Sequence, residues 1–123
     1  MRSGTRLRQS LVLYAVTGAF ACGSAAGQDS ATVAAGREIA HDVYLGNCLA
    51  CHRIPGDPSA VTSATIGPPI VDMRSRYPDR AVLRAQIWDP TQRNPRTVMP
   101  PFGKHGVLSE REIDLVVDYI YQY

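Results

Sequence analysis

Two cysteines and a histidine in the segment 48–52 have the spacing of a covalent haem attachment site. Cys48 and Cys51 are separated by two residues, and His52 follows the second cysteine directly. Two thioether bonds to the haem vinyl groups need two sulfur atoms presented from about one helical turn, and the adjacent imidazole is then held beneath the iron as its proximal ligand. The sequence therefore predicts one haem c, bound covalently through Cys48 and Cys51 and ligated by His52.

Two other kinds of site use a pair of cysteines at this spacing, namely a redox dithiol and half of a zinc site. His52 directly after Cys51, and the lack of a second such pair in the sequence, argue against both. A redox dithiol of the thioredoxin type would also lie among alternating strands and helices, a pattern that is missing here. Haem attachment is therefore the favoured interpretation.

The iron of such a haem takes a sixth ligand or keeps an open coordination position, and four side chains compete for this place. Met99 lies in a stiff apolar segment that contains two prolines and can reach the haem. Met73 is more typical of core or loop packing, His41 falls within a predicted helix, and His105 is expected at the surface. Met99 is the predicted iron ligand, and its thioether favours Fe(II) and raises the reduction potential.

A segment between these ligands has a predicted supporting role. A ligating histidine usually donates its other ring N–H to a carbonyl group, which sets the orientation and basicity of the ring. The carbonyl of Pro68, in Gly67-Pro68-Pro69, is the candidate acceptor, although a simple turn explains this tripeptide equally well. Trp88 could donate its indole N–H to a haem propionate or could pack in the core at the end of a helix.

A helix must lead into the attachment segment. Apolar residues at helical spacing predict it over 30–49, with Asp29 or Ser30 as its N-cap. Gly36 in the middle of this helix costs roughly 1 kcal/mol relative to Ala, so we expect another part of the chain to pack closely against it. Tyr119 in the last helix is the candidate. The apolar positions that support the prediction are Val33, Ala40, Val43 and Tyr44.

Two further helices have clear start signals. Pro78 and Asp79 open a helix over about 79–88, which Pro90 ends. A capping box that begins at Ser109 opens the last helix. The predicted buried faces are Val82, Leu83, Gln86 and Ile87 in the former, and Ile113, Val116, Val117 and Ile120 in the latter.

The remaining segments predict loops, and the fold class is all-α. The segments 53–69 and 89–104 are rich in turn-forming residues and lack any periodicity. The chain shows neither strand-like alternation nor an internal repeat. A domain of this size has a thin apolar core, so a covalent haem would supply both a cross-link and core volume. We therefore expect the protein without haem to be largely unfolded.

The N-terminus has the pattern of a secretory signal. Arginines precede the apolar run 11–20, and small residues up to Ala26 fit a cleavage site, which predicts a signal peptide over 1–26 and a domain over 27–123. This predicts an exported protein of the periplasm. Cys22 could instead mark a lipoprotein cleavage site and tether the same domain to a membrane, although the residues before it lack the expected pattern.

Charge gives little indication of a partner. The formal net charge of +2 becomes −1 after signal removal, since ten basic residues then face eleven acidic ones. This balance does not suggest a nucleic-acid partner. Basic residues recur over 74–96, where they could form a local docking face or a solvated surface.

The residues described above resemble those of class I cytochromes c. In that family the first and last helices cross at a contact between a glycine and an aromatic residue, and a proline carbonyl supports the proximal histidine. A closer resemblance, strongest over 83–121, is to SoxX, the monohaem subunit of the bacterial SoxAX cytochrome complex. The segments that carry it are 47–52, 67–69, 83–90 and 94–105.

This resemblance implies a periplasmic heterodimer in thiosulfate oxidation. A SoxA cytochrome subunit would hold the catalytic haem, thiosulfate would be joined oxidatively to a cysteine of the carrier protein SoxYZ, and this chain would pass electrons to a downstream acceptor. The chain would then be an electron-transfer subunit without a catalytic residue of its own. The alternatives are a free-standing periplasmic electron shuttle and a catalytic or gas-binding haem with an open iron position.

Overall fold

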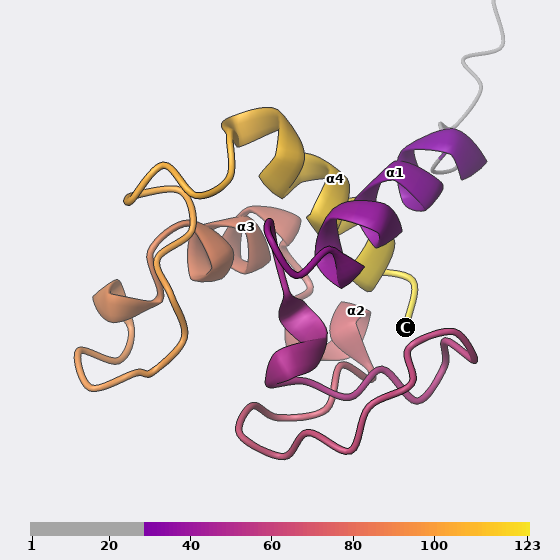
Figure 1. Ribbon diagram of the computed structural model, residues 1–123. Coiled ribbons are helices and arrows are strands. Elements are labelled where there is room, and N and C mark those ends of the chain that lie inside the picture. The colour runs from indigo at the N-terminus through magenta and orange to yellow at the C-terminus, as the bar shows by residue number, and fades with distance from the viewer. Residues whose placement is uncertain (1–28) are drawn as a thin grey trace, which may run out of the picture.

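The computed structural model describes residues 29–123, which contain helices and no strand (Figure 1). The all-α class predicted from the sequence is therefore confirmed for this part of the chain. The predicted signal peptide, its cleavage site and Cys22 lie outside the described residues. The elements are α1 (Ser30–His41), the 3₁₀ helix η1 (Cys48–Ala50), α2 (Met73–Arg76), α3 (Arg80–Trp88), the 3₁₀ helix η2 (Pro90–Gln92) and α4 (Glu110–Ile120).

Helix α1 begins where it was predicted to begin but ends earlier. Asp29 is the N-cap, and its side chain accepts a hydrogen bond from the backbone N–H of Ala31. The prediction of one helix over 30–49 was wrong, because α1 ends at His41 and a turn follows it. Val43 and Tyr44, which were placed on the helix, are 64% and 91% exposed.

The turn after α1 has a physical cause in its own residues. The side chain of Asp42 accepts from the backbone N–H of Tyr44 at 2.7 Å, and this local bond competes with continued helix. Asn47 has a φ of 45°, in the left-handed region that asparagine tolerates better than most residues. Gly46 donates its N–H back to the carbonyl of Ile39 at 3.1 Å. The chain is thereby redirected, and the attachment segment starts in η1 instead of continuing α1.

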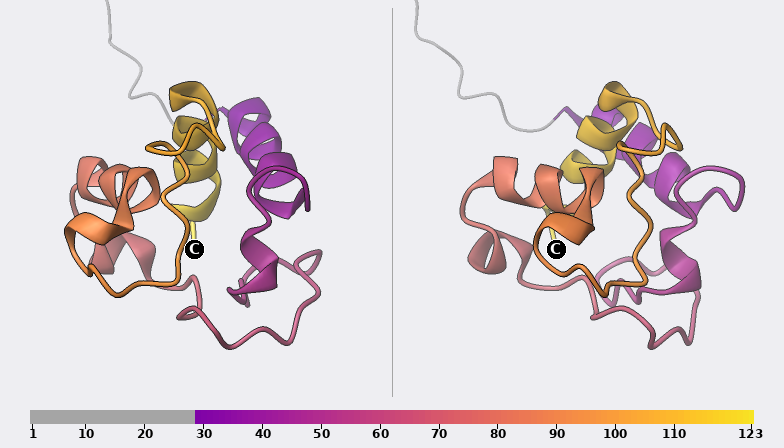
Figure 2. Two further views of the ribbon diagram at one scale, coloured as in Figure 1. Left: turned by 60° about the vertical axis from the view of Figure 1, so that its left-hand side comes forward. Right: turned by 90° about the vertical axis from the view of Figure 1, so that its left-hand side faces the viewer.

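Helices α1 and α4 cross in contact (Figures 1 and 2). A Cβ atom added to Gly36 would lie 1.9 Å from the backbone oxygen of Leu115 and 3.0 Å from the Cβ of Tyr119. The predicted close contact of Gly36 with Tyr119 is therefore confirmed. Tyr119 is fully buried, and Ser109 and Glu112 form the predicted capping box at the start of α4.

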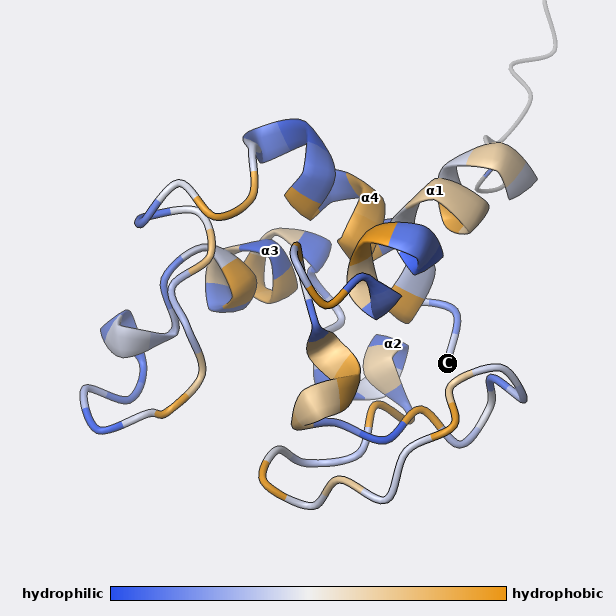
Figure 3. Cartoon of the chain, viewed as in Figure 1, coloured by the Kyte–Doolittle hydropathy of each residue, from blue (hydrophilic) through white to orange (hydrophobic). Residues whose placement is uncertain are grey.

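Helix α3 lies within one residue of its predicted range. Asp79 caps it by accepting from the backbone N–H of Ala81. Leu83 and Ile87 are buried as predicted, whereas Val82 is 42% exposed and lies outside the buried stripe. On the side that faces α4, Arg84 Nε donates to Asp114 Oδ1 at 2.6 Å. Figure 3 shows hydrophobic and hydrophilic residues alternating around α3 and α4, as is typical of amphipathic helices.

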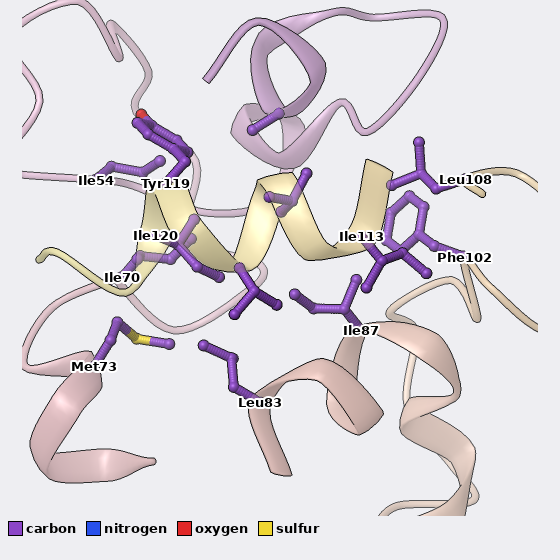
Figure 4. Close-up of a cluster of buried hydrophobic side chains, with 13 residues drawn as sticks. Ile54, Ile70, Met73, Leu83, Ile87, Phe102, Leu108, Ile113, Tyr119 and Ile120 are labelled. Carbon is purple, nitrogen blue, oxygen red and sulfur yellow. The ribbon is translucent and has the colours of Figure 1, made fainter. Parts of the chain in front are cut away.

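The short helix α2 was not predicted. It follows Asp72, whose φ is 52°, and it buries Met73 against the core. Side chains from the loops, α2 and α3 converge on α4 (Figure 4). Among residues 29–123, no helix has the length and apolar character needed to cross a membrane. The buried apolar core consists of Ala40, Ile54, Ile70, Met73, Leu83, Ile87, Phe102, Leu108, Ile113, Val116, Val117, Tyr119 and Ile120.

Candidate haem site

A cavity of about 530 Å³ opens between η1, the loop after it, α3 and the segment that carries Met99. Its walls are mainly apolar, and several core side chains line it from the inside. Every residue that the sequence predicted for the haem site lies on this cavity, although the segments are far apart along the chain. These residues are Cys48, Cys51, His52, Pro68 and Met99.

The attachment segment is a single tight turn. The backbone N–H groups of Cys51 and His52 both donate to the carbonyl of Cys48, at 3.2 and 2.9 Å. This turn places two free thiols and one imidazole on the same cavity. Burial raises the pKa of the Cys48 thiol to about 11, so this thiol is protonated at neutral pH. A reactive redox dithiol depends on a thiolate, and the environment of Cys48 disfavours that state.

His52 is oriented by the segment that the sequence singled out. Its Nδ1 lies 2.7 Å from the carbonyl oxygen of Pro68. Because a carbonyl oxygen only accepts, Nδ1 must carry the proton, and the lone pair of the neutral ring is then on Nε2. The backbone N–H of Gly67 donates to the carbonyl of Cys51 at 2.8 Å, which ties this loop to the attachment turn.

Gly67 forms a cradle for the imidazole. A Cβ atom at this position would lie 2.3 Å from Cε1 of His52, so no side chain fits without moving the ring. The imidazole is therefore held by a hydrogen bond at one nitrogen and by backbone against its face. Such contacts to a metal-binding histidine fix the orientation of its ring.

Two thioether sulfurs line the cavity, and their surroundings differ. Met99 is half-buried, its backbone N–H donates to Thr97 Oγ1 at 3.1 Å, and Gln86 Nε2 lies 3.9 Å from its sulfur. Met73 is only 4% exposed and belongs to the core, and Arg76 Nη1 lies 3.6 Å from its sulfur. The structure thus places Met73 as a core residue at the cavity wall.

The other candidates lie away from the cavity. His41 Nε2 is 3.0 Å from the hydroxyl of Tyr119. His105 is exposed. Trp88 packs against Gly103, where an added Cβ would lie 2.1 Å from its ring, and it lines a separate hollow beside α3. The residues that line the cavity include neither His41 nor His105, and they do not include Trp88.

Sequence reasoning missed two polar residues on the cavity wall. Gln86 was counted as part of the apolar stripe of α3, and Arg76 belongs to the unpredicted helix α2. The signal for Gln86 was present in the sequence, since an amide within an otherwise apolar stripe needs a hydrogen-bond partner. Arg76 gave no such signal, because its position depends on how the chain returns after the loop.

The residues on the cavity fit a covalently bound haem. The cavity offers two thiols on one turn, an imidazole with an oriented Nε2 lone pair, a thioether and an extensive apolar wall. The close approach of Gly67 to His52 supports this assignment, because an ordinary core histidine would not require a glycine against its ring. A helical chain that holds this donor set around an apolar cavity is a c-type cytochrome domain.

Comparison with known proteins gives the same class. The chain belongs to the family described as cytochrome c oxidase, cbb3-type, subunit III, whose sequence profile matches residues 31–120. It is also similar to an uncharacterized lipoprotein of Aquifex aeolicus (strain VF5), with 34% identity over 76 residues. That match covers 62% of this chain and 36% of the relative, so the chain spans about a third of the relative's length.

The class of protein defines the chemistry at a general level. As a member of a cytochrome c family, the chain carries covalently bound haem c, a group whose iron can take up and release one electron.

Proposed function

We propose that this chain is the electron-accepting subunit of a periplasmic thiosulfate-oxidising cytochrome complex, with a SoxA-like cytochrome as its partner. The observation that carries the proposal is where the SoxX-like segments lie in the fold. Of the four segments, 83–90 and 94–105 both contribute residues to the cavity wall. The resemblance therefore covers the part of the chain that determines the haem environment, as well as the attachment motif.

At this site Cys48 and Cys51 would hold the haem through thioether bonds, and His52 Nε2 and the sulfur of Met99 would be the protein ligands of its iron. Haem c supplies an iron that alternates between Fe(II) and Fe(III) and so carries one electron. His52 presents its lone pair because Pro68 holds the proton on the other nitrogen. Met99 would supply a thioether sulfur, a soft ligand that favours the Fe(II) state which an electron acceptor must reach.

The residues of this chain support electron transfer as its role and the sulfur chemistry as the role of its partners. Joining thiosulfate to a carrier cysteine forms a sulfur–sulfur bond, and the thiol proton and two electrons leave. The proposed haem attachment uses both cysteines of the predicted mature chain, so no thiol remains there to hold a sulfur substrate. In the proposed complex the sulfur chemistry lies on the SoxA-like partner and the carrier SoxYZ, and this chain receives electrons one at a time.

Co-expression with the neighbouring genes tests the proposal. We expect the haem-loaded protein to co-purify with a second cytochrome, and thiosulfate to reduce its haem when the carrier protein is present. Omission of the carrier is the matched control and should leave the haem oxidised. Failure to associate with any second cytochrome, together with a haem that thiosulfate leaves oxidised, would contradict the proposal.

A free-standing electron shuttle is the second candidate. The matched family is described as an oxidase subunit, which is compatible with a carrier that delivers electrons to an oxidase. Such a shuttle would be monomeric and would be oxidised by a membrane fraction that contains a terminal oxidase. Stoichiometric co-purification with another cytochrome separates the two proposals, because only the first requires a permanent partner.

For localisation, we propose export to the periplasm by the signal peptide 1–26. The alternative is cleavage before Cys22 and attachment of a lipid to that cysteine. The A. aeolicus relative is named as a lipoprotein, which supports Cys22 as a lipid attachment site. If Cys22 is lipidated, a Cys22→Ala variant should move from the membrane fraction to the soluble periplasmic fraction. An unchanged distribution would favour cleavage after Ala26.

A further inference from the structure

Gln86 is a polar residue in the part of α3 that faces the core. Its helical neighbours Leu83 and Ile87 are buried, and all three side chains line the haem cavity. Gln86 itself is half-buried. A side-chain amide in such surroundings is costly unless it has a hydrogen-bond partner, so its contact identifies what it does there.

The partner of this amide is the proposed iron ligand. Gln86 Nε2 lies 3.9 Å from the sulfur of Met99, within the range of a hydrogen bond to sulfur. Within residues 29–123 this is the one hydrogen bond made by the Gln86 side chain. Thr97 Oγ1 holds the backbone of the same methionine at 3.1 Å. Met99 is thus held at two points, one on its backbone and one on its sulfur.

We propose that Gln86 is a positioning residue for Met99, a role that rests on the proposed ligation of iron by this methionine. A thioether sulfur has two lone pairs. An amide N–H that binds one of them leaves the other directed to the iron and withdraws electron density from the sulfur. A weaker donor stabilises Fe(III) less than Fe(II), so this contact raises the reduction potential.

The same contact distinguishes the two methionines on the cavity. The sulfur of Met73 lies 3.6 Å from Arg76 Nη1, and the backbone N–H of Met73 donates to the carbonyl of Tyr123 at 2.9 Å. Met73 is therefore held in the core by α2 and the C-terminus. Met99 lies in a loop. Thr97 holds only its backbone, and the amide of Gln86 is the group that restrains the position of its sulfur.

A Gln86→Leu variant of the haem-loaded protein tests the proposal. We expect its reduction potential to fall, so that the ratio of reduced to oxidised protein at a fixed solution potential decreases several-fold. A tenfold change corresponds to 59 mV for one electron. The absorption band near the red end of the spectrum of the oxidised protein, which depends on ligation of the iron by a thioether, should also shift. Gln86→Ala gives the same test if leucine prevents folding.

Gln92→Leu is the matched control. The amide of Gln92 donates to Asp89 at 3.0 Å, and Gln92 is not among the cavity-lining residues. We expect its substitution to leave the potential and the red absorption unchanged. A fall as large as that of Gln86→Leu would overturn the proposal, because it would show that the potential responds to any lost amide.

A double-mutant cycle identifies the atom through which Gln86 acts. In a Met99→Ala background, Gln86→Leu should cause no further change of potential, because the sulfur that it contacts is gone. An equal fall in that background would overturn the positioning role and indicate a general effect of cavity polarity. If Met99→Ala itself leaves the red absorption unaltered, the ligation by Met99 is wrong and this inference falls with it. If ligation holds and Gln86→Leu changes nothing, only this inference is wrong.

Discussion

The proton on Nδ1 of His52 is held by the protein itself. The carbonyl of Pro68, 2.7 Å away, accepts a hydrogen bond from this N–H, and the backbone of Gly67 lies close against the ring. In the folded protein the loop 67–69 therefore contributes to the orientation of the imidazole. The function of this tripeptide is then more than that of a turn.

Replacement of Gly67 tests this orientation. In Gly67→Ala the added Cβ would lie 2.3 Å from Cε1 of His52, so the ring or the loop must move. We expect a changed haem absorption spectrum, a shifted reduction potential and a lower yield of haem-loaded protein. These are measured by optical spectroscopy and potentiometric titration.

Gly106→Ala is the control for that substitution. Gly106 has a φ of 66° and no heavy atom within 4 Å of an added Cβ, so alanine there strains only the backbone. We expect it to lose about 1 kcal/mol of unfolding free energy while keeping the wild-type spectrum and potential. A normal spectrum and potential in Gly67→Ala would contradict the role of the cradle.

At the scale of elements, the helix α1 that contacts α4 directly precedes the turn that leads into the attachment segment. Gly36 lets the backbone of α1 approach the carbonyl of Leu115, and the turn after His41 then carries the chain into η1. The crossing and the haem segment are therefore consecutive parts of one structure. A change in the crossing should be transmitted to the cavity.

Gly36→Ala should separate these two helices. Alanine is the better helix former by roughly 1 kcal/mol. Its Cβ, however, would lie 1.9 Å from a backbone oxygen that cannot rotate away. We expect a net loss of roughly 3 kcal/mol of unfolding free energy, measured by denaturant titration of the haem-loaded protein.

Ala34→Gly is the matched variant on the exposed side of α1. It should lose only about 1 kcal/mol, from helix propensity alone. A Gly36→Ala protein as stable as the wild type would show that the helices do not approach as closely as the structure indicates.

A second element contact joins α1, the loop after the haem segment and α4 through Asp57. The hydroxyl of Tyr119 donates to its carboxylate at 2.5 Å, Ser59 Oγ donates at 2.5 Å, and Arg37 Nε lies 3.3 Å away. Burial acts to raise the pKa of Asp57, but the hydrogen bonds from Ser59 and Tyr119 outweigh it and hold that pKa well below its usual range. His41 Nε2 also faces this carboxylate, at 3.6 Å.

This arrangement predicts a loss of stability in acid. A carboxyl group whose pKa is lower in the folded protein contributes stability that is present above its unfolded pKa of about 3.8 and is lost as the pH falls below that value. Asp57→Asn should therefore be less stable at pH 7 and should lose less stability between pH 5 and pH 2. Unfolding free energies measured across this range check the prediction.

Tyr119→Phe should weaken the same acid dependence, because it removes one of the hydrogen bonds that lower the pKa of Asp57. His41 adds a separate step, since burial and the charge of Arg37 lower its pKa below 6.5 in the folded protein. Protonation of His41 thus favours the unfolded chain as the pH falls below that value. The role of Asp57 would be contradicted if the unfolding free energy of Asp57→Asn fell below pH 4 as steeply as that of the wild-type protein.

At the scale of the whole molecule, the haem cavity and the apolar core share their side chains. Seven of the thirteen buried apolar residues line the cavity. An enclosed empty cavity costs about 24 cal/mol per Å³, so about 530 Å³ sets an upper limit of ~13 kcal/mol. That is as large as the whole stability of an ordinary domain. The shared residues are Ile70, Met73, Leu83, Ile87, Phe102, Leu108 and Ile120.

The protein without haem should consequently lack its native fold. In a Cys48→Ala/Cys51→Ala variant, we expect loss of most of the helical far-UV circular dichroism and of cooperative thermal unfolding. The single Cys51→Ala variant serves as the comparison, because one remaining thioether can still hold the haem. A native-like helical spectrum in the double variant would contradict this expectation.

Apart from the contacts of Gly36 with Tyr119 and of His52 with Pro68, the parts of the molecule that were predicted correctly depend on neighbours within a few positions. The caps at Asp29, Asp79 and Ser109 bond to backbone groups two or three residues away, so their residue types suffice to place the helix starts. The same holds for the spacing of Cys48 and Cys51. The end of α1 was missed because helical periodicity continues through Val43 and Tyr44, while the side chain of Asp42 and the returning chain stop the helix.

By itself the sequence determined the haem attachment chemistry, the all-α class and the methionine in a stiff loop, because each depends on residue type and short spacing. Only the tertiary structure decided which groups surround those atoms. Gln86 meets the sulfur of Met99 and Tyr119 meets Asp57 across long stretches of chain, and no local pattern encodes such contacts. They follow from how closely α1, α3 and α4 pack, and that packing determines the environment in which the iron would be held.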